Sequence, residues 1–149
     1  MPYIKLSIIF SLFISSISYA NSNFTEIFNK HSAVMLLIDP NTGAIVNSNK
    51  AAHQFYGLPK DKLESIFIRD INLLSKGQVA SEIALAKAEN RQHFIFRHKL
   101  GNGDVKTVAD YSAPIILNNK NLLFSIIQDI TDERDLKHDL WHYQANLEK

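Results

Sequence analysis

The side chain best suited to take part in chemistry is His98, which lies in a segment whose apolar and polar residues alternate as in a β-strand. His98 shares one side of that predicted strand with Phe94 and Phe96, so we expect its imidazole in the core or at the rim of a cavity. An imidazole placed there must find a hydrogen-bond partner, and it could report pH or hold a carboxylate. The alternative is a core histidine whose hydrogen bonds are simply satisfied.

Three further side chains could contact a ligand. Arg97 lies on the opposite side of the strand from His98 and could clamp a carboxylate with two hydrogen bonds, although a solvated arginine is the ordinary alternative. Tyr111 lies on the more apolar side of its own predicted strand, and Tyr56 lies at the end of a predicted helix. Either tyrosine could offer its hydroxyl to a ligand, with packing as the alternative role. Tyr56, Arg97, His98 and Tyr111 are therefore the candidate ligand-binding residues.

Metal binding and catalysis have little support in the sequence. His138 and His142 are spaced i, i+4 and could share an ion with Asp135 or Asp139, but an exposed polar helix face explains them better because a metal site needs more ligands. The chain has no cysteine. It also has no glycine-rich phosphate loop after a strand, no G-x-S-x-G turn and no His-Glu-x-x-His motif. We therefore expect no catalytic residue, no metal site and no enzyme activity.

The composition indicates one exported domain. The chain has 149 residues, of which 46% are hydrophobic, enough for a single core. In the first twenty residues Lys5 is the only charge, the centre is apolar, and Ser18-Tyr19-Ala20 has the small-any-small pattern of a cleavage site, which predicts a signal peptide over 1–20. The alternative is an uncleaved membrane anchor. The domain is then expected in the periplasm, or anchored to the inner membrane and facing the periplasm.

The charge balance argues against nucleic-acid binding. Lys and Arg number 16 and Asp and Glu number 15 in the whole chain. Removal of Lys5 with the predicted signal peptide leaves equal numbers of each sign. A neutral domain lacks the basic surface that binds phosphate backbones, so we expect no nucleic-acid partner.

Hydrophobic periodicity predicts two strands, a helical insert, three more strands and a terminal helix. In the helix expected over 76–90, Val79, Ala80, Ile83, Ala84 and Ala88 are predicted to face inward. The predicted strands are 34–38, 44–48, 92–100, 105–117 and 122–131, and the other predicted helices lie near 49–56, 60–65 and 68–74.

The pattern of burial predicts how the strands pair. The first and last strands are apolar on both faces and should be central, whereas the second and third carry more polar residues and suit the edges. We therefore predict an α+β fold: a five-stranded antiparallel sheet in the order 2-1-5-4-3, with helices on one face and a C-terminal helix.

An ordered set of motifs over residues 24–134 resembles the PAS family. The motifs are Ile38-Asp39-Pro40 with Gly43, Asn49-Lys50-Ala51-Ala52 before Phe55-Tyr56-Gly57, Phe94 to Leu100 before Gly101-Asn102-Gly103, and the exit Asp129-Ile130-Thr131. The chain is most similar to the exported PAS sensor modules that precede diguanylate cyclase (GGDEF) domains in bacteria. No output domain occurs in this sequence.

The resemblance implies a non-enzymatic sensor that binds a small ligand or a protein partner and relays a change from the last strand to the C-terminal helix. PAS modules that hold heme use a histidine of the long helix, which residues 76–90 lack, and the chain has no sign of a flavin site. We therefore expect no cofactor, and either an unmodified small ligand or an empty packed core. A ligand-free dimerisation or scaffold module and a small α+β enzyme are the alternative functions.

The C-terminal segment is expected to be an output helix. Leu136, Leu140, Tyr143 and Leu147 are spaced 4, 3, 4 and form an a/d seam. A helix this short is marginal alone, so the seam needs a partner, either a second copy of the chain or the exposed face of the domain's own sheet. We predict a parallel homodimer through both terminal helices. The expected organisation is a signal peptide at 1–20, a PAS sensor domain at 21–131 and a signalling or coiled-coil helix at 132–149.

Overall fold

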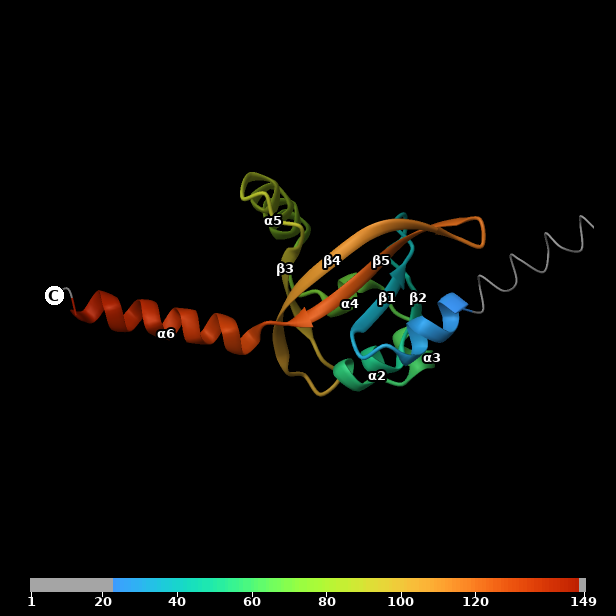
Figure 1. Ribbon diagram of the computed structural model, residues 1–149, viewed down its shortest axis with the longest axis horizontal. Coiled ribbons are helices and arrows are strands. Elements are labelled where there is room, and N and C mark those ends of the chain that lie inside the picture. Colours follow the sequence, from blue (N-terminus) through green and yellow to red (C-terminus); the bar gives the residue numbers. More distant parts are fainter. Residues whose placement is uncertain (1–22, 148–149) are drawn as a thin grey trace, which may run out of the picture.

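A computed structural model describes residues 23–147 and contains a five-stranded antiparallel sheet in the order β2-β1-β5-β4-β3 (Figure 1). This order confirms the fold predicted from the sequence. β5 is central because it pairs with β1 on one side and with β4 on the other. The strands are β1 (Val34–Ile38), β2 (Ile45–Ser48), β3 (Phe94–Lys99), β4 (Val105–Leu117) and β5 (Lys120–Asp129).

The helices occupy three places around the sheet. Residues 23–30 form a helix before β1, four helices lie between β2 and β3, and the last helix leaves the end of β5 as a rod (Figure 1). The predicted signal peptide at 1–20 lies outside the described residues. No helix within residues 23–147 has the length and apolar character needed to cross a bilayer. The labelled helices are α2 (Lys50–Tyr56), α3 (Lys60–Leu63), α4 (Ile68–Ile71), α5 (Lys76–Ala88) and α6 (Thr131–Leu147).

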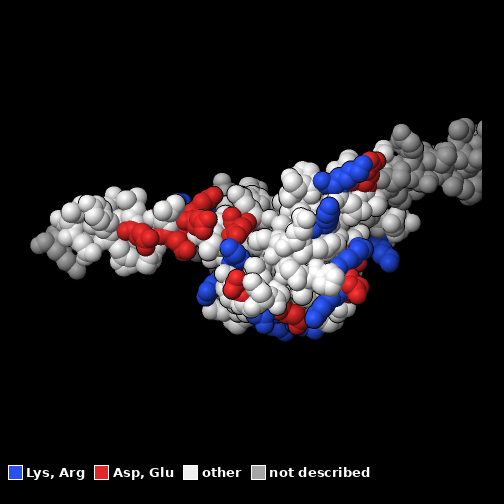
Figure 2. Space-filling model, turned by 90° about the horizontal axis from the view of Figure 1, so that it is seen from below, with Lys and Arg blue, Asp and Glu red and all other residues white. Residues whose placement is uncertain are grey.

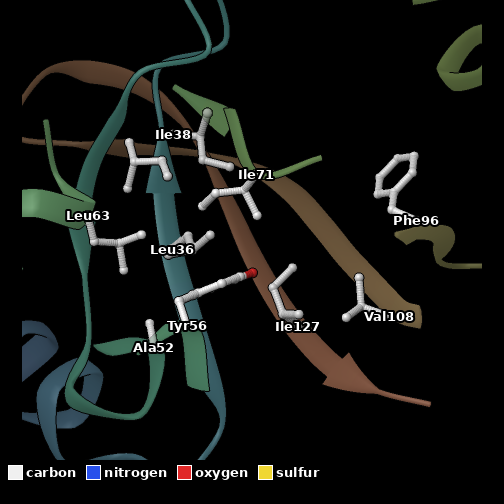
Figure 3. Close-up of a cluster of buried hydrophobic side chains, with 10 residues drawn as sticks. Leu36, Ile38, Ala52, Tyr56, Leu63, Ile71, Phe96, Val108 and Ile127 are labelled. Carbon is white, nitrogen blue, oxygen red and sulfur yellow. The ribbon is translucent and has the colours of Figure 1, made fainter. Parts of the chain in front are cut away.

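The main core lies between the inner face of the sheet and helices α2 to α4. Because side chains alternate along a strand, Leu36 and Ile38 of β1 point to the same side as Ile127 of β5. Burial of these apolar side chains supplies the main driving force for the fold. Figure 3 shows the cluster, which includes Leu36, Ile38, Ala52, Tyr56, Leu63, Ile71, Phe96, Val108 and Ile127.

The outer face of the sheet is covered in part by the helix at residues 23–30. Phe28 of this helix is buried, and its ring lies 5.6 Å from Phe24 and 6.4 Å from Phe124 of β5. Met35, Leu37 and Leu122 are the other buried members of this second cluster. The helix therefore supplies a cover for the central strands from within the same chain.

A buried asparagine joins the sheet to the helical insert. Asn49 precedes α2, and its Oδ1 accepts hydrogen bonds from the backbone N–H of Ala52 at 3.0 Å and of Met35 at 3.1 Å. Its amide Nδ2 donates to the carbonyl of Ala33 at 2.8 Å. One side chain thus caps the helix and holds the start of β1.

Helix α5 presents only part of the predicted face to the core: Val79 packs against the main cluster, whereas Ile83 is 47% exposed. Ala80, Ala84 and Ala88 are exposed, whereas Ala86 is buried and Val79 is half-buried. The reason is the edge of the sheet: the Glu82 carboxylate accepts a 2.7 Å hydrogen bond from the backbone N–H of Ile95 on β3. The helix turns to place Glu82 against this edge, and the alanine stripe faces solvent.

Candidate functional site

A pocket of about 570 Å³ lies between the inner face of the sheet and helices α4 and α5. This volume falls in the range of about 300–1,000 Å³ that is typical of small-molecule sites. Its wall is mostly apolar, and Arg69 and Lys76 are its two basic residues. The apolar wall includes Ile38, Val79, Ile83, Phe94, Phe96 and Leu123.

The wall also contains a carboxyl group, that of Asp110 on β4. Asp110 is 6% exposed and lies between two apolar cross-strand neighbours, Phe94 on β3 and Ile127 on β5. Burial raises the pKa of Asp110, and hydrogen bonds from Ser112 and Ser125 oppose this rise. A buried acid with a shifted pKa in an apolar pocket is typical of a functional site.

Two serines connect Asp110 to the central strand. The Ser112 hydroxyl donates to Asp110 Oδ1 at 2.7 Å, and the Ser125 hydroxyl on β5 lies 2.6 Å from the Ser112 hydroxyl. Because Ser112 uses its only proton on Asp110, Ser125 is the donor in the second bond. A chain of hydrogen bonds therefore joins the pocket wall on β4 to β5.

Tyr56 and His98 form a polar pair inside the core. The Tyr56 hydroxyl lies 2.9 Å from His98 Nδ1, and both residues are fully buried. His98 Nε2 has no hydrogen-bond partner within residues 23–147. Burial lowers the pKa of His98 to about 4, so the imidazole is neutral at physiological pH. Burial raises the pKa of Tyr56, so its hydroxyl stays protonated.

The junction between β5 and α6 is held by a short network. Asp129 Oδ1 accepts from the backbone N–H of Thr131 at 3.0 Å and from its hydroxyl at 2.6 Å. The backbone of β4 adds two bonds, from Ile130 N–H to the Thr107 carbonyl at 2.9 Å and from Thr107 N–H to Thr131 Oγ1 at 3.0 Å. Partial burial acts to raise the pKa of Asp129, but the bonds from Thr131 and the charge of Lys106 outweigh it and lower the pKa.

Three solved structures have the same arrangement of sheet and helices. A PAS domain from Colwellia psychrerythraea matches 74% of this chain and 97% of its own length, with a TM-score of 0.59 and 20% identity. A PAS domain from Desulfitobacterium hafniense matches 70% and 98%, with a TM-score of 0.57 and 21% identity. The PAS domain of an HTR-like protein from Haloarcula marismortui matches 80% and 99%, with a TM-score of 0.61 and 15% identity. The chain folds as a PAS domain.

Curated relatives connect this PAS domain with diguanylate cyclases. Diguanylate cyclase DgcM of Escherichia coli K12 is 33% identical over 122 residues, which are 80% of this chain and 30% of DgcM. DgcM of Escherichia coli O157:H7 is 34% identical over 123 residues, with the same shares. The PAS domain therefore spans about 30% of the length of the curated relatives it matches. No family model matches the chain.

The structure brings together only two of the four candidate ligand-binding residues of the PAS domain. Tyr56 and His98 meet in the core, as described above, beside the pocket residue Phe96, whose ring stacks on His98 at 6.3 Å. Arg97 is exposed and Tyr111 is 40% exposed. Tyr111 pairs with Ile126 on the outer face and lies 5.0 Å from the ring of His93, away from the pocket.

Sequence reasoning missed Asp110, Ser112 and Ser125. The hydrophobic pattern of β4 makes the side with Tyr111 and Ala109 look like the core side, yet the structure turns Asp110 and Ser112 inward. A buried polar site inverts the pattern that normally marks the inner face of a strand. One signal in the sequence was Ser125, a polar residue within the apolar run of β5. In the structure it pairs with Ser112 on β4.

A serine, a histidine and a glutamate also meet at the edge strand β2, but in the wrong order for nucleophilic catalysis. The Ser48 hydroxyl donates to Glu64 Oε1 at 2.9 Å and lies 2.8 Å from His53 Nε2. In a catalytic triad the histidine lies between the serine and the acid, whereas here the serine lies between the other two. Ser48 is also fully buried, so this cluster ties β2 to α2 and α3.

The two histidines of α6 do not gain further metal ligands. His138 Nε2 and His142 Nε2 lie 2.9 Å apart on an exposed part of the helix. Within residues 23–147 no group of three or more His, Asp or Glu side chains is placed to hold a metal ion.

Proposed function

We propose that this PAS domain is the input part of a signalling system of the diguanylate cyclase type. In this proposal a small molecule binds in the pocket beside Asp110, and the resulting change reaches α6. The similarity to DgcM supports the signalling role, and the size and apolar wall of the pocket support a small-molecule ligand. The domain itself has no catalytic step, and the output activity belongs to a partner or to a further domain.

The observation that carries this proposal is the connection from the pocket to α6 along two adjacent strands. On β4, Asp110 and Thr107 are three residues apart, about 10 Å of strand. Asp110 lies in the pocket wall, and Thr107 bonds to the first residue of α6. On β5, Ser125 joins the pocket network and Asp129 caps the helix. A ligand that prefers one arrangement of this network would shift the start of α6.

The proposed output device is a dimer of α6 helices. Leu136, Leu140, Tyr143 and Leu147 are between 57% and 69% exposed and lie along one seam. Figure 2 shows acidic side chains along the part of α6 next to the domain and uncharged surface over much of its far half. Exposed apolar side chains in a row are typical of a surface that binds a partner. We propose a second copy of the chain as that partner, with a ligand-free dimerisation module as the alternative function.

Export to the periplasm is a separate proposal, which rests on residues 1–20 alone. Mass spectrometry of the protein made in its own host would measure the mature N-terminus. A protein that starts near Asn21 supports export with cleavage, and an intact N-terminus supports the membrane anchor instead.

The pocket can be tested by filling it. Val79→Trp places a large ring in the pocket wall, whereas Leu85→Trp on the same helix adds the same ring at a half-exposed position outside the pocket. Native mass spectrometry of protein purified from its own host should show a small molecule on the wild type and on L85W, but not on V79W. A wild-type protein without a bound molecule, or equal retention by V79W, would contradict the pocket as a ligand site.

The relay has its own readout. Hydrogen exchange should be compared before and after the bound molecule is removed by mild denaturation and refolding. We expect the amides of Ile130 to Arg134 and of Thr107 to change their exchange rates. Unchanged rates at these positions would contradict the relay while leaving ligand binding intact.

A further inference from the structure

Asp110 is the acidic residue of the pocket wall, and it has no partner of opposite charge within the described residues. Asp110 makes none of the ion pairs found within residues 23–147. An ionised carboxylate that is buried without a cation is costly, because the lost hydration is not replaced. The carboxylate of Asp110 therefore lacks a cationic partner, and a bound molecule could supply one.

The two basic residues of the pocket do not fill this role. The guanidinium of Arg69 lies over the ring of Phe67, 4.0 Å from its centroid, and its Nη1 lies 3.5 Å from the carbonyl of Thr42. Arg69 and Lys76 are both exposed. They line the pocket from helices α4 and α5, while Asp110 lies on β4 of the sheet.

The hydroxyls around Asp110 present it as a hydrogen-bond acceptor. Ser112 donates to Oδ1, and Ser125 donates to Ser112, so both protons point along the chain toward the carboxylate. These hydrogen bonds oppose the burial that raises the pKa of Asp110, and they leave acceptor capacity for a donor in the pocket. Phe94 and Phe96 lie beside Asp110 on the same face, and their rings offer an apolar and aromatic surface to the rest of a ligand.

We infer that the pocket takes an apolar amine, with its ammonium group against Asp110 and its hydrocarbon body among Val79, Phe94 and Phe96. This inference rests on the proposed function and gives its ligand a chemical class. The opposite orientation, an apolar acid held by Arg69 and Lys76 on the helical side of the pocket, is the outcome that the test must exclude. A charge-assisted bond to a buried carboxylate is stronger than a neutral one, so the ammonium group should dominate the affinity.

Isothermal titration calorimetry with three probes of similar size tests the class. The probes are 2-phenylethylamine, 2-phenylethanol and 3-phenylpropanoate, each titrated into the whole chain at neutral pH. We expect the amine to bind at least tenfold more tightly than the alcohol or the acid. In Asp110→Asn the affinity for the amine should fall at least tenfold, while the affinity for the alcohol stays within about threefold, which also shows that the variant is folded.

Two control variants separate the possible failures. Asp61→Asn makes the same chemical change on the exposed helix α3 and should leave all three affinities unchanged. Val79→Trp should weaken every probe. Tightest binding by the acid or the alcohol, or an amine affinity that D110N does not change, would overturn the amine inference and leave the pocket proposal standing. Absence of binding by all three probes, or binding that V79W does not weaken, would overturn both.

Discussion

Thr107 on β4 and Thr131 at the start of α6 hold the exit of the domain together. The backbone N–H of Thr107 donates to Thr131 Oγ1 at 3.0 Å, and the Thr131 hydroxyl donates to Asp129 Oδ1 at 2.6 Å. One hydroxyl therefore links the penultimate strand, the last strand and the first turn of the helix. In the proposed relay this link would carry a shift of the sheet to α6, in which no residue is fully buried.

Replacement of Thr131 by valine keeps the shape of the side chain and removes this hydroxyl. We expect a loss of about 1 kcal/mol in the free energy of unfolding, the usual net value of a hydrogen bond, and faster hydrogen exchange at Thr107 and in the first turn of α6. Urea unfolding and exchange mass spectrometry measure the two effects. Thr107→Val is the matched control, because Thr107 takes part through its backbone. Equal effects of both substitutions would argue against the role of the Thr131 hydroxyl.

The Tyr56–His98 pair predicts a non-additive double mutant. Tyr56→Phe leaves both imidazole nitrogens without partners in the core and should cost roughly 1–3 kcal/mol. His98→Phe in the same protein removes the stranded polar group, so the double variant should recover much of this loss. The measurement is a double-mutant cycle in urea. Losses that simply add would show that the pair is not coupled.

His98 also predicts how stability depends on pH. Its pKa is about 4 in the folded state against an ordinary value of 6.5, so the unfolded chain takes up the proton first as the pH falls. The contribution of His98 is therefore complete above pH 6.5 and is lost between pH 6.5 and 4, by at most about 3 kcal/mol. Thermal unfolding of the wild type and of Tyr56→Phe/His98→Phe across this range should show a shallower decline in the double variant. Parallel curves would refute the assignment to His98.

Asp110→Asn should stabilise the protein at neutral pH. Because burial raises the pKa of Asp110, the ionised carboxylate opposes folding above that pKa, and the cost disappears as the pH falls and the group takes up a proton. We expect D110N to be more stable than the wild type by about 1 kcal/mol or more at pH 7.5, the usual scale of a partly compensated buried charge, and the difference to shrink toward pH 4. A gain that persists unchanged at low pH would point to a cause other than ionisation. Asp61→Asn again provides the control.

The seam of α6 predicts a concentration-dependent dimer. Leu140→Lys places a charge in the centre of the seam and should produce a monomer, whereas Gln144→Lys adds the same charge outside it and should not. Sedimentation equilibrium of the whole chain up to high micromolar concentration measures the change. A wild-type chain that stays monomeric over this range would contradict dimerisation through α6.

The amino-acid sequence determined the strands, their order and the exit motif of this protein. Hydrophobic runs that are apolar on both faces, such as Val34–Ile38, belong at the centre of a sheet whatever surrounds them. Asn49 and Asp129 act through bonds to backbone groups a few residues away or at the start of a neighbouring strand, and such caps are visible in the order of residue types.

Only the tertiary structure decided which faces form the site. Asp110 and Ser112 point inward because β4 is held in register between β3 and β5, and this register overrides the apolar pattern that favours the side of Tyr111. Likewise, α5 is oriented so that Glu82 accepts a hydrogen bond from the backbone N–H of Ile95. The sequence pattern of neither segment predicts this contact. Side-chain periodicity is a local property, whereas a buried acid and a covered sheet edge depend on contacts between distant segments.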